Sequence, residues 1–118
     1  MTTNVTIFHN PRCSKSRRTL QLLQENGVEP TIVEYLREPP STEQISQLLA
    51  LLGLTPRELM RTKEAAYRDN RLHASDLDDT ALIAAMHEHP ILIERPIVVA
   101  GDAAVLGRPP EDVLSLLP

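Results

Sequence analysis

Cys13, the only cysteine of this 118-residue chain, is the residue whose type most directly offers chemistry. A single thiol excludes an intramolecular disulfide and a cysteine-rich zinc site. It leaves a buried spectator thiol, an intermolecular disulfide or a nucleophile. The residues around the thiol must decide among these three.

Positive charge is concentrated around Cys13, although the chain as a whole has a formal net charge of −4. The cations within this short segment are Arg12, Lys15, Arg17 and Arg18. They favour the thiolate and would attract an incoming anion. His9 stands in the same loop, four residues before the thiol. By residue type alone a free cysteine is more often a small buried hydrophobe, but this setting favours a nucleophile.

Two further features limit the chemistry. Ser16 occupies the second position of a C-x-x-C spacing, so no internal disulfide can form and an external thiol must complete any redox cycle. Arg95-Pro96 precedes a predicted strand, and such an X-Pro bond can be cis beside a catalytic loop. The sequence therefore predicts a reaction with one nucleophile and an external reductant.

The N-terminal elements place Cys13 at the start of a helix. Val5 to Phe8 is a β-branched and aromatic run, and the turn residues His9-Asn10-Pro11 follow it. Apolar residues then recur at helical spacing from Ser16 to Asn26-Gly27, and Thr31 to Leu36 predicts a second strand. The connection predicts a parallel βαβ unit with a right-handed crossover.

The rest of the chain predicts a helical insert followed by a hairpin and a last helix. The predicted elements are a helix from Ser41 to Gly53, a short helix from Thr55 to Arg61, a helix from Asp78 to His89, strands Ile97 to Ala100 and Ala103 to Leu106, and a helix from Pro110 to Leu117. The first two helices carry capping-box signatures. The order predicts the α/β class with a mixed four-stranded sheet.

Three segments carry a resemblance to a known family. HNPRCSKSR, HPILIERPIVV and LGRPPEDVL closely resemble the glutaredoxin-dependent arsenate reductase family, which has a thioredoxin-like fold. The match extends over nearly the whole chain. It implies one thioredoxin-like domain, residues 1–118, with the helical insert at about 41–89.

The resemblance also implies roles for individual residues. Cys13 matches the nucleophile that attacks arsenate, and His9 matches a histidine that helps to lower the thiol pKa. Ser16 matches a hydroxyl-bearing position. Pro96 matches the proline before the third strand, which implies a cis bond that brings the Arg95 guanidinium next to the thiol. The three arginines implied to form the oxyanion site are Arg61, Arg95 and Arg108.

The implied activity is reduction of arsenate to arsenite. Glutathione is the expected cosubstrate, glutaredoxin is the expected protein partner, and no bound cofactor is expected. Planar guanidinium groups suit a tetrahedral oxyanion because they present paired N–H donors. Two alternatives stay open: a thiol oxidoreductase acting on another small substrate, and a non-enzymatic Spx-type regulator that binds RNA polymerase. The missing C-x-x-C redox switch argues against the regulator.

Composition excludes several other classes of protein. The negative net charge gives no global field that would attract nucleic acid. No apolar run approaches the roughly 20 residues that span a bilayer, and the start of the chain has no signal-peptide pattern, so we expect a cytoplasmic protein without a membrane partner. His73, His87 and His89 show no metal-ligand spacing, and no metal is expected.

Overall fold

A computed structural model describes residues 4–117. The chain divides into two compact units. The sheet unit comprises the chain up to Glu38 and from Arg95 onward, and the helical unit comprises Pro39–Glu94.

The elements follow one another in the order β1 (Val5–Phe8), α1 (Ser14–Glu25), β2 (Thr31–Val33), α2 (Thr42–Leu52), α3 (Pro56–Leu59), α4 (Ala65–Asp69), α5 (Asp79–Glu88), the 3-10 helix η1 (Pro90–Leu92), β3 (Ile97–Ala100), β4 (Ala103–Leu106) and the 3-10 helix η2 (Pro110–Leu116).

The four strands form one mixed sheet in the order β2-β1-β3-β4. β1 pairs in parallel with β2, while β3 pairs antiparallel with both β1 and β4. The predicted class, the parallel βαβ pairing and the terminal hairpin are therefore confirmed. In the hairpin, Gly101 has φ of 62°, a left-handed conformation that glycine adopts without strain.

The second strand is shorter than the sequence predicted. Thr31 to Leu36 was expected to be extended, but β2 ends at Val33. Its last partner is Phe8, where β1 also ends. Beyond that point the amides of Arg37 and Glu38 donate to the Glu34 carbonyl at 2.9 Å each, so the chain turns instead of continuing as a strand.

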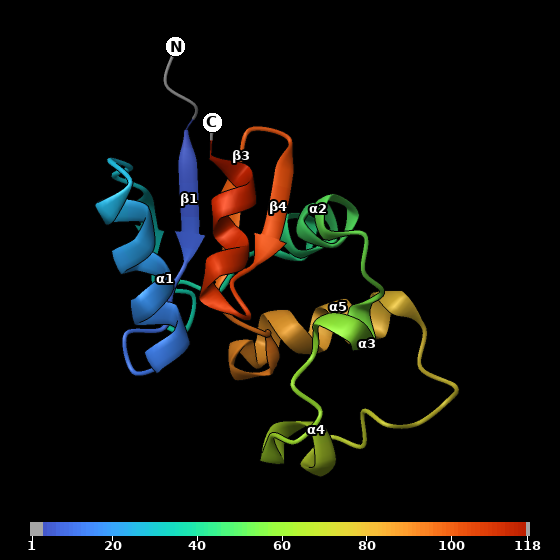
Figure 1. The fold of residues 1–118 in the computed structure, drawn as a ribbon. Coiled ribbons are helices and arrows are strands. Elements are labelled where there is room, and N and C mark those ends of the chain that lie inside the picture. Colours follow the sequence, from blue (N-terminus) through green and yellow to red (C-terminus); the bar gives the residue numbers. More distant parts are fainter. Residues whose placement is uncertain (1–3, 118) are drawn as a thin grey trace. The chain divides into compact units, whose positions relative to one another are not determined.

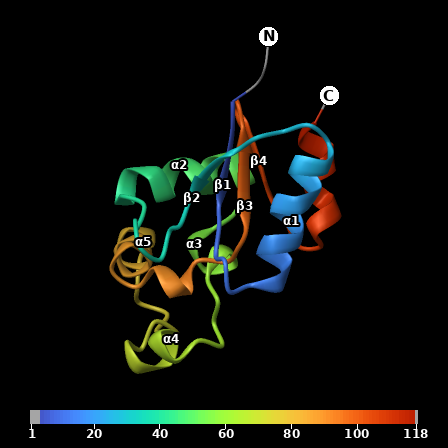
Figure 2. The ribbon, with the colours of Figure 1, turned by 90° about the vertical axis from the view of Figure 1, so that its left-hand side faces the viewer.

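One face of the sheet is covered by α1 and the C-terminal 3-10 helix, which lie side by side in Figures 1 and 2. Their shared apolar cluster consists of Val5, Ile7, Leu22, Leu23, Val98, Ala100 and Val113. Burial of such side chains contributes roughly 1.5 to 3 kcal/mol each relative to exposure. This cluster fixes α1, and thereby the loop before it, against the central strands.

The sequence predicts the position of the last helix correctly, but the helix is of the 3-10 type and not an α-helix. Residues 110–116 form a 3-10 helix, and Val113 alone among them is fully buried. Pro109 precedes it and Pro110 occupies its first turn. A 3-10 helix puts residues three apart on one face, which suits a short segment that inserts one side chain into the core.

The helical unit begins with two helices that the capping signals located well. Ser41 and Gln44 form a complete capping box at α2, and Thr55 and Glu58 form another at α3. Gly53 ends α2 with φ of 69°, as a left-handed C-cap. α5 packs against α2 and α3, as Figure 1 also shows.

Two short elements of the helical unit were not predicted from the sequence. α4 has no buried residue, so its sequence has no apolar stripe to reveal it. η1 follows α5 directly, with Pro90 in its first turn. The segments after α3 and η1 then meet in an isolated antiparallel bridge between Met60 and Ile93.

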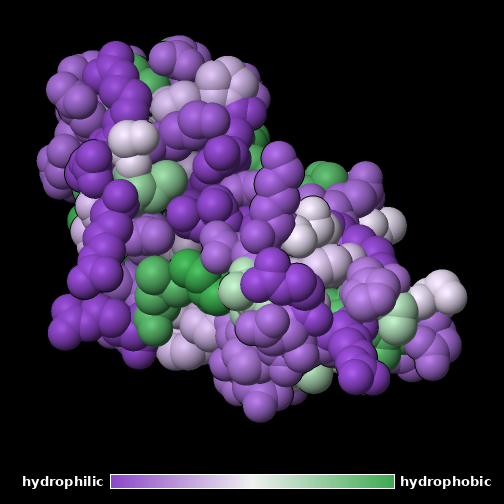
Figure 3. All heavy atoms as spheres, turned by 90° about the horizontal axis from the view of Figure 1, so that it is seen from below, coloured by the Kyte–Doolittle hydropathy of each residue, from purple (hydrophilic) through white to green (hydrophobic). Residues whose placement is uncertain are grey.

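Figure 3 shows a face on which hydrophilic side chains predominate and hydrophobic ones form small patches. Among residues 4–117 the exposed large hydrophobic side chains are Ile32, Leu51 and Leu114. Over the same residues, no helix has both the length and the apolar character needed to cross a membrane.

Candidate active site

Cys13 occupies the N-cap position of α1, immediately after the loop that leaves β1. Its amide donates to the Asn10 carbonyl at 3.0 Å, and its own carbonyl accepts from the Arg17 amide at 3.0 Å. The Asn10 side chain in turn accepts from the Arg12 amide at 3.0 Å. The loop is therefore folded onto itself, and it presents a half-buried thiol at the first turn of a helix.

The surroundings of Cys13 lower the pKa of its thiol. Burial acts in the opposite direction, as the largest single influence, because it disfavours the charged thiolate. Hydrogen bonds from the Ser16 amide, the Arg95 side chain and the Lys15 amide together outweigh it, and the Arg95 charge adds to them. The free amides of the first helical turn and one guanidinium are thus the groups that favour the nucleophilic form.

His9 and Ser16 share a buried hydrogen bond of 2.7 Å between Nδ1 and Oγ. The Ser16 hydroxyl also accepts from the Asn10 amide at 3.0 Å. Burial lowers the pKa of His9 below its ordinary value; the charge of Glu34 opposes this shift and that of Arg17 adds to it. The imidazole is therefore mainly neutral at neutral pH. His9 is not among the groups that lower the Cys13 pKa.

Arg95 and Arg108 lie together in the sheet unit. The Arg108 Nη1 donates to the Arg95 carbonyl at 3.2 Å, and both side chains are half-buried. The Arg95-Pro96 and Arg108-Pro109 bonds are both cis. Arg95 also hydrogen-bonds the thiol, so the structure brings Cys13, Arg95 and Arg108 to one end of the sheet unit.

Gly107 is a residue of this region that the sequence reasoning missed. Its amide donates to the Pro96 carbonyl at 2.9 Å. A Cβ at this position would lie 2.5 Å from Thr19 Oγ1 and 2.8 Å from Pro96 Cγ. Only glycine fits where the segment that carries Arg108 passes between α1 and the proline. The sequence signal that could have identified this residue is a glycine directly before the Arg108-Pro109 pair.

Arg61 belongs to the helical unit. Its Nε lies 2.9 Å from Glu64 Oε1, and its Nη1 lies 3.1 Å from Glu94 Oε1. Two backbone hydrogen bonds flank the bridge between Met60 and Ile93. The Arg61 amide donates to the Leu92 carbonyl at 2.7 Å, and the Glu94 amide donates to the Leu59 carbonyl at 2.8 Å. Backbone and side chain are thus both fixed. The sequence reasoning did not identify the two carboxylates, because their pairing depends on the bridge.

The histidines outside the loop take other positions. His87 Nδ1 lies 2.8 Å from the Pro40 carbonyl, and His89 caps the C-terminus of α5. Within residues 4–117 no group of three His, Cys, Asp or Glu side chains is arranged to hold a metal ion.

The mixed four-stranded sheet with its helices defines an α/β protein of the thioredoxin-like class. The model of the ArsC family matches residues 8–116. The chain belongs to the ArsC family, as the sequence predicted.

Relatives agree with this assignment. The chain is 54% identical over 118 residues to the "Uncharacterized protein YfgD" of Escherichia coli K12, with 99% of each chain covered. It is 46% identical over 115 residues to an "Arsenate reductase" of Haemophilus influenzae, covering 97% of this chain and 99% of that one. A solved structure called arsenate reductase, from Vibrio cholerae, matches with a TM-score of 0.96 and 51% identity over 99% of this chain and 100% of that chain.

Proposed function

We propose that this protein reduces arsenate to arsenite, with Cys13 as the nucleophile and with glutathione and glutaredoxin as the reductants, in the cytoplasm. The observation that carries the proposal is the position of Cys13 at the N-cap of α1, where the Ser16 and Lys15 amides and the Arg95 guanidinium lower the pKa of its thiol. An activated thiolate beside a guanidinium suits attack on the centre of an oxyanion. The arsenate reductases among the relatives support the same substrate.

In the proposed reaction the Cys13 thiolate forms a bond to arsenic, and one arsenate oxygen leaves as water. The glutathione sulfur then bonds to arsenic and displaces a second oxygen as water. A glutaredoxin thiolate next attacks the glutathionyl sulfur and forms a mixed disulfide with it, the As–S bond to glutathione breaks, and its electron pair stays on arsenic, which becomes As(III). Two thiols lose two electrons in total, and arsenic gains them. The Cys13–arsenic bond is finally hydrolysed, which releases arsenite and returns the thiol.

The arginines are proposed to bind the arsenate oxygens, as the resemblance implies for Arg61, Arg95 and Arg108. Arg95 and Arg108 are held together by the 3.2 Å hydrogen bond, which supports a joint role for this pair. The assignment of Arg61 rests on the family motif alone. Charge-assisted hydrogen bonds from such groups act most strongly where charge develops in the transition state.

A turnover assay with arsenate, glutathione and glutaredoxin tests this function. Wild-type protein is expected to form arsenite only when all three are present, and Cys13→Ser is expected to form none. Turnover of another small oxidised substrate but not of arsenate would favour the general thiol oxidoreductase. No turnover of either, together with binding to RNA polymerase, would favour the Spx-type regulator.

A further inference from the structure

A cavity of about 530 Å³ lies in the sheet unit, beside the loop that precedes Cys13. Its lining residues are His9, Asn10, Pro11, Arg12, Glu34, Leu36 and Arg37. The volume is within the range of roughly 300 to 1,000 Å³ that is typical of small-molecule sites. The roles proposed above for Cys13 and the three arginines leave this cavity unexplained.

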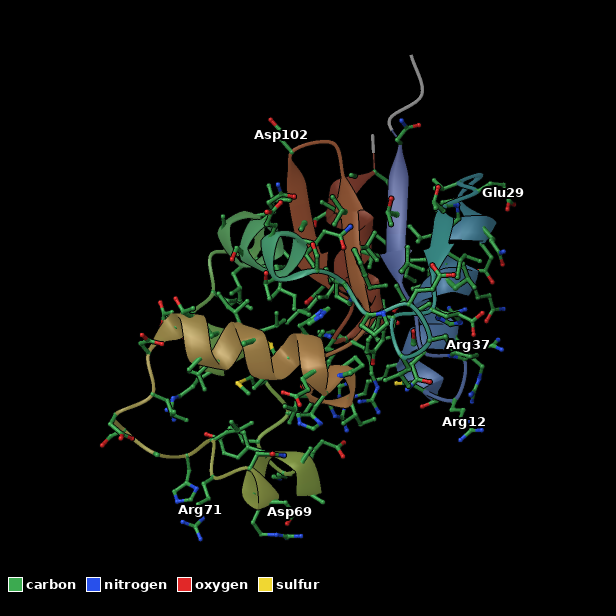
Figure 4. All side chains as sticks on the ribbon, turned by 180° about the vertical axis from the view of Figure 1, so that it is seen from behind. Arg12, Glu29, Arg37, Asp69, Arg71 and Asp102 are labelled. Carbon is green, nitrogen blue, oxygen red and sulfur yellow. The ribbon has the colours of Figure 1, made fainter. Side chains whose placement is uncertain are left out.

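The cavity has charges of both signs on its walls. Arg12 and Arg37 are exposed, and neither guanidinium has a hydrogen bond or ion pair with another side chain or carbonyl within residues 4–117. Figure 4 shows both arginines at the same end of the sheet unit. Glu34 is half-buried, and its charge raises the pKa of His9 against the larger effect of burial. Two cations and one carboxylate therefore border the same space.

A ligand that matches this wall must carry two negative groups and one positive group. A simple oxyanion such as arsenate would meet the Glu34 carboxylate with repulsion, whereas a zwitterionic peptide would pair with it. Glutathione has two carboxylates, one ammonium group and a thiol. Arginine pairs with carboxylate in a bidentate geometry, which orients the ligand as well as binding it.

We propose that this cavity binds reduced glutathione, with its carboxylates on Arg12 and Arg37 and its ammonium group on Glu34. The inference rests on the proposed function for the identity of the reductant. Cys13 does not line the cavity, but it directly follows Arg12 of the cavity wall, so the thiol of a tripeptide held there is expected to reach the nucleophile. The site raises the local concentration of the attacking thiol.

A binding experiment tests the cavity without any turnover. The wild-type protein is titrated with S-methylglutathione, which cannot form a disulfide, and backbone amide resonances are followed by NMR. Saturable shifts are expected for the amides of Arg12, Glu34 and Arg37. Arg37→Glu is expected to weaken binding by about tenfold or more, the value of one charge-assisted pair. Arg68→Glu makes the same charge change on an exposed helix of the other unit and is expected to bind normally.

Two results of this titration would overturn the site. One is the absence of saturable shifts around the cavity, and the other is equal affinity in wild type and Arg37→Glu. Triglycine is the matched control ligand, because it has the length of glutathione but only one carboxylate. Equal affinity for triglycine would also overturn the proposal.

Steady-state kinetics separates this inference from the proposed function. Arg37→Glu is expected to raise KM for glutathione about tenfold and to leave KM for arsenate within about twofold. An equal rise in both constants would overturn the site. If S-methylglutathione binds in the cavity but arsenate is not reduced, the proposed function fails and the binding site stands. If arsenate is reduced but S-methylglutathione does not bind in the cavity, the binding site fails and the proposed function stands.

Discussion

His9 Nδ1 lies 2.7 Å from the hydroxyl oxygen of Ser16, and this contact joins the end of β1 to the first turn of α1. The Ser16 amide hydrogen-bonds the Cys13 thiol, so one residue binds the imidazole with its side chain and the nucleophile with its backbone. Since burial lowers the pKa of His9, we propose that His9 acts on the thiol through the position of Ser16, as a positioning residue.

The first prediction concerns the thiol. Cys13 is expected to titrate below the free-thiol value of about 8.5, because hydrogen bonds from the helix and from Arg95 outweigh burial. Arg95→Met removes one of these bonds and one charge, so the pKa of Cys13 is expected to rise. Thiolate absorbance against pH measures both. Arg68→Met is the matched control, and an equal rise in both variants would contradict the role of Arg95.

The second prediction concerns pH and stability. Burial lowers the pKa of His9 below 6.5, so below that pH the unfolded chain binds more protons than the folded chain. The stabilisation is complete above about pH 6.5 and is lost as the pH falls through the lowered value. Denaturant unfolding is expected to show this loss in wild type and a smaller one in His9→Asn. Equal pH dependence in the two proteins would contradict the assignment.

Replacing His9 also tests the hydrogen bond itself. His9→Ala leaves the buried Ser16 hydroxyl without the imidazole, at a cost of about 1 to 3 kcal/mol in the free energy of unfolding. Asparagine can place a polar atom near the position of Nδ1, so His9→Asn is expected to recover part of the loss. The pKa of Cys13 is expected to rise more in His9→Ala than in His9→Asn. Identical values for the two variants would show that Ser16 does not depend on this bond.

Much of the fold could be predicted because the local signals agree with one another. The capping boxes at Ser41 and Thr55 located two helix starts, and Gly101-Asp102 located the hairpin. The end of β2 could not be predicted, because Tyr35 and Leu36 are residues typical of a strand and only the end of β1 removes their pairing partners. Local patterns carry no information about the length of a neighbouring strand.

The candidate site, like the fold, could be predicted from the sequence only in part. The position of Cys13 at a helix N-terminus followed from a strand, a turn and a helical pattern in sequence. The pairing of Arg61 with Glu94 could not be predicted, since it needs the bridge between residues 60 and 93. The lowered pKa of His9 could not be predicted either, because it depends on burial, which the sequence alone does not show.

The third prediction concerns Gly107. Gly107→Ala places a methyl group 2.5 Å from Thr19 Oγ1 and 2.8 Å from Pro96 Cγ, so the segment before Arg108 must move. Overpacking of this kind costs roughly 1 to 3 kcal/mol. Thermal unfolding is expected to show the loss. The double variant with Thr19→Ala is expected to lose less than the sum of the single variants, because one of the two close contacts is gone. Simple additivity would contradict the steric cause.

The fourth prediction concerns the arginines and tests the proposed oxyanion site. Lysine keeps the charge of arginine but lacks the planar pair of donors. Arg61→Lys, Arg95→Lys and Arg108→Lys are each expected to lower kcat/KM for arsenate by roughly 10 to 100-fold, which corresponds to a charge-assisted hydrogen bond of about 1.5 to 3 kcal/mol. The measurement is steady-state arsenite formation at saturating glutathione.

Arg68→Lys is the matched control for Arg61→Lys, because both arginines lie in the helical unit and pair with a carboxylate. Arg68 is mostly exposed, at 77% of its side chain, and its contact with Asp69 is 3.5 Å. Exposed pairs of this kind contribute about 0 to 1 kcal/mol, so nearly unchanged turnover is expected. Equal losses at the two positions would contradict a specific oxyanion role for Arg61, because Arg68 is not part of the proposed site. Normal turnover of Arg61→Lys alone would remove that residue from the site and leave Arg95 and Arg108, whose 3.2 Å contact already places them together.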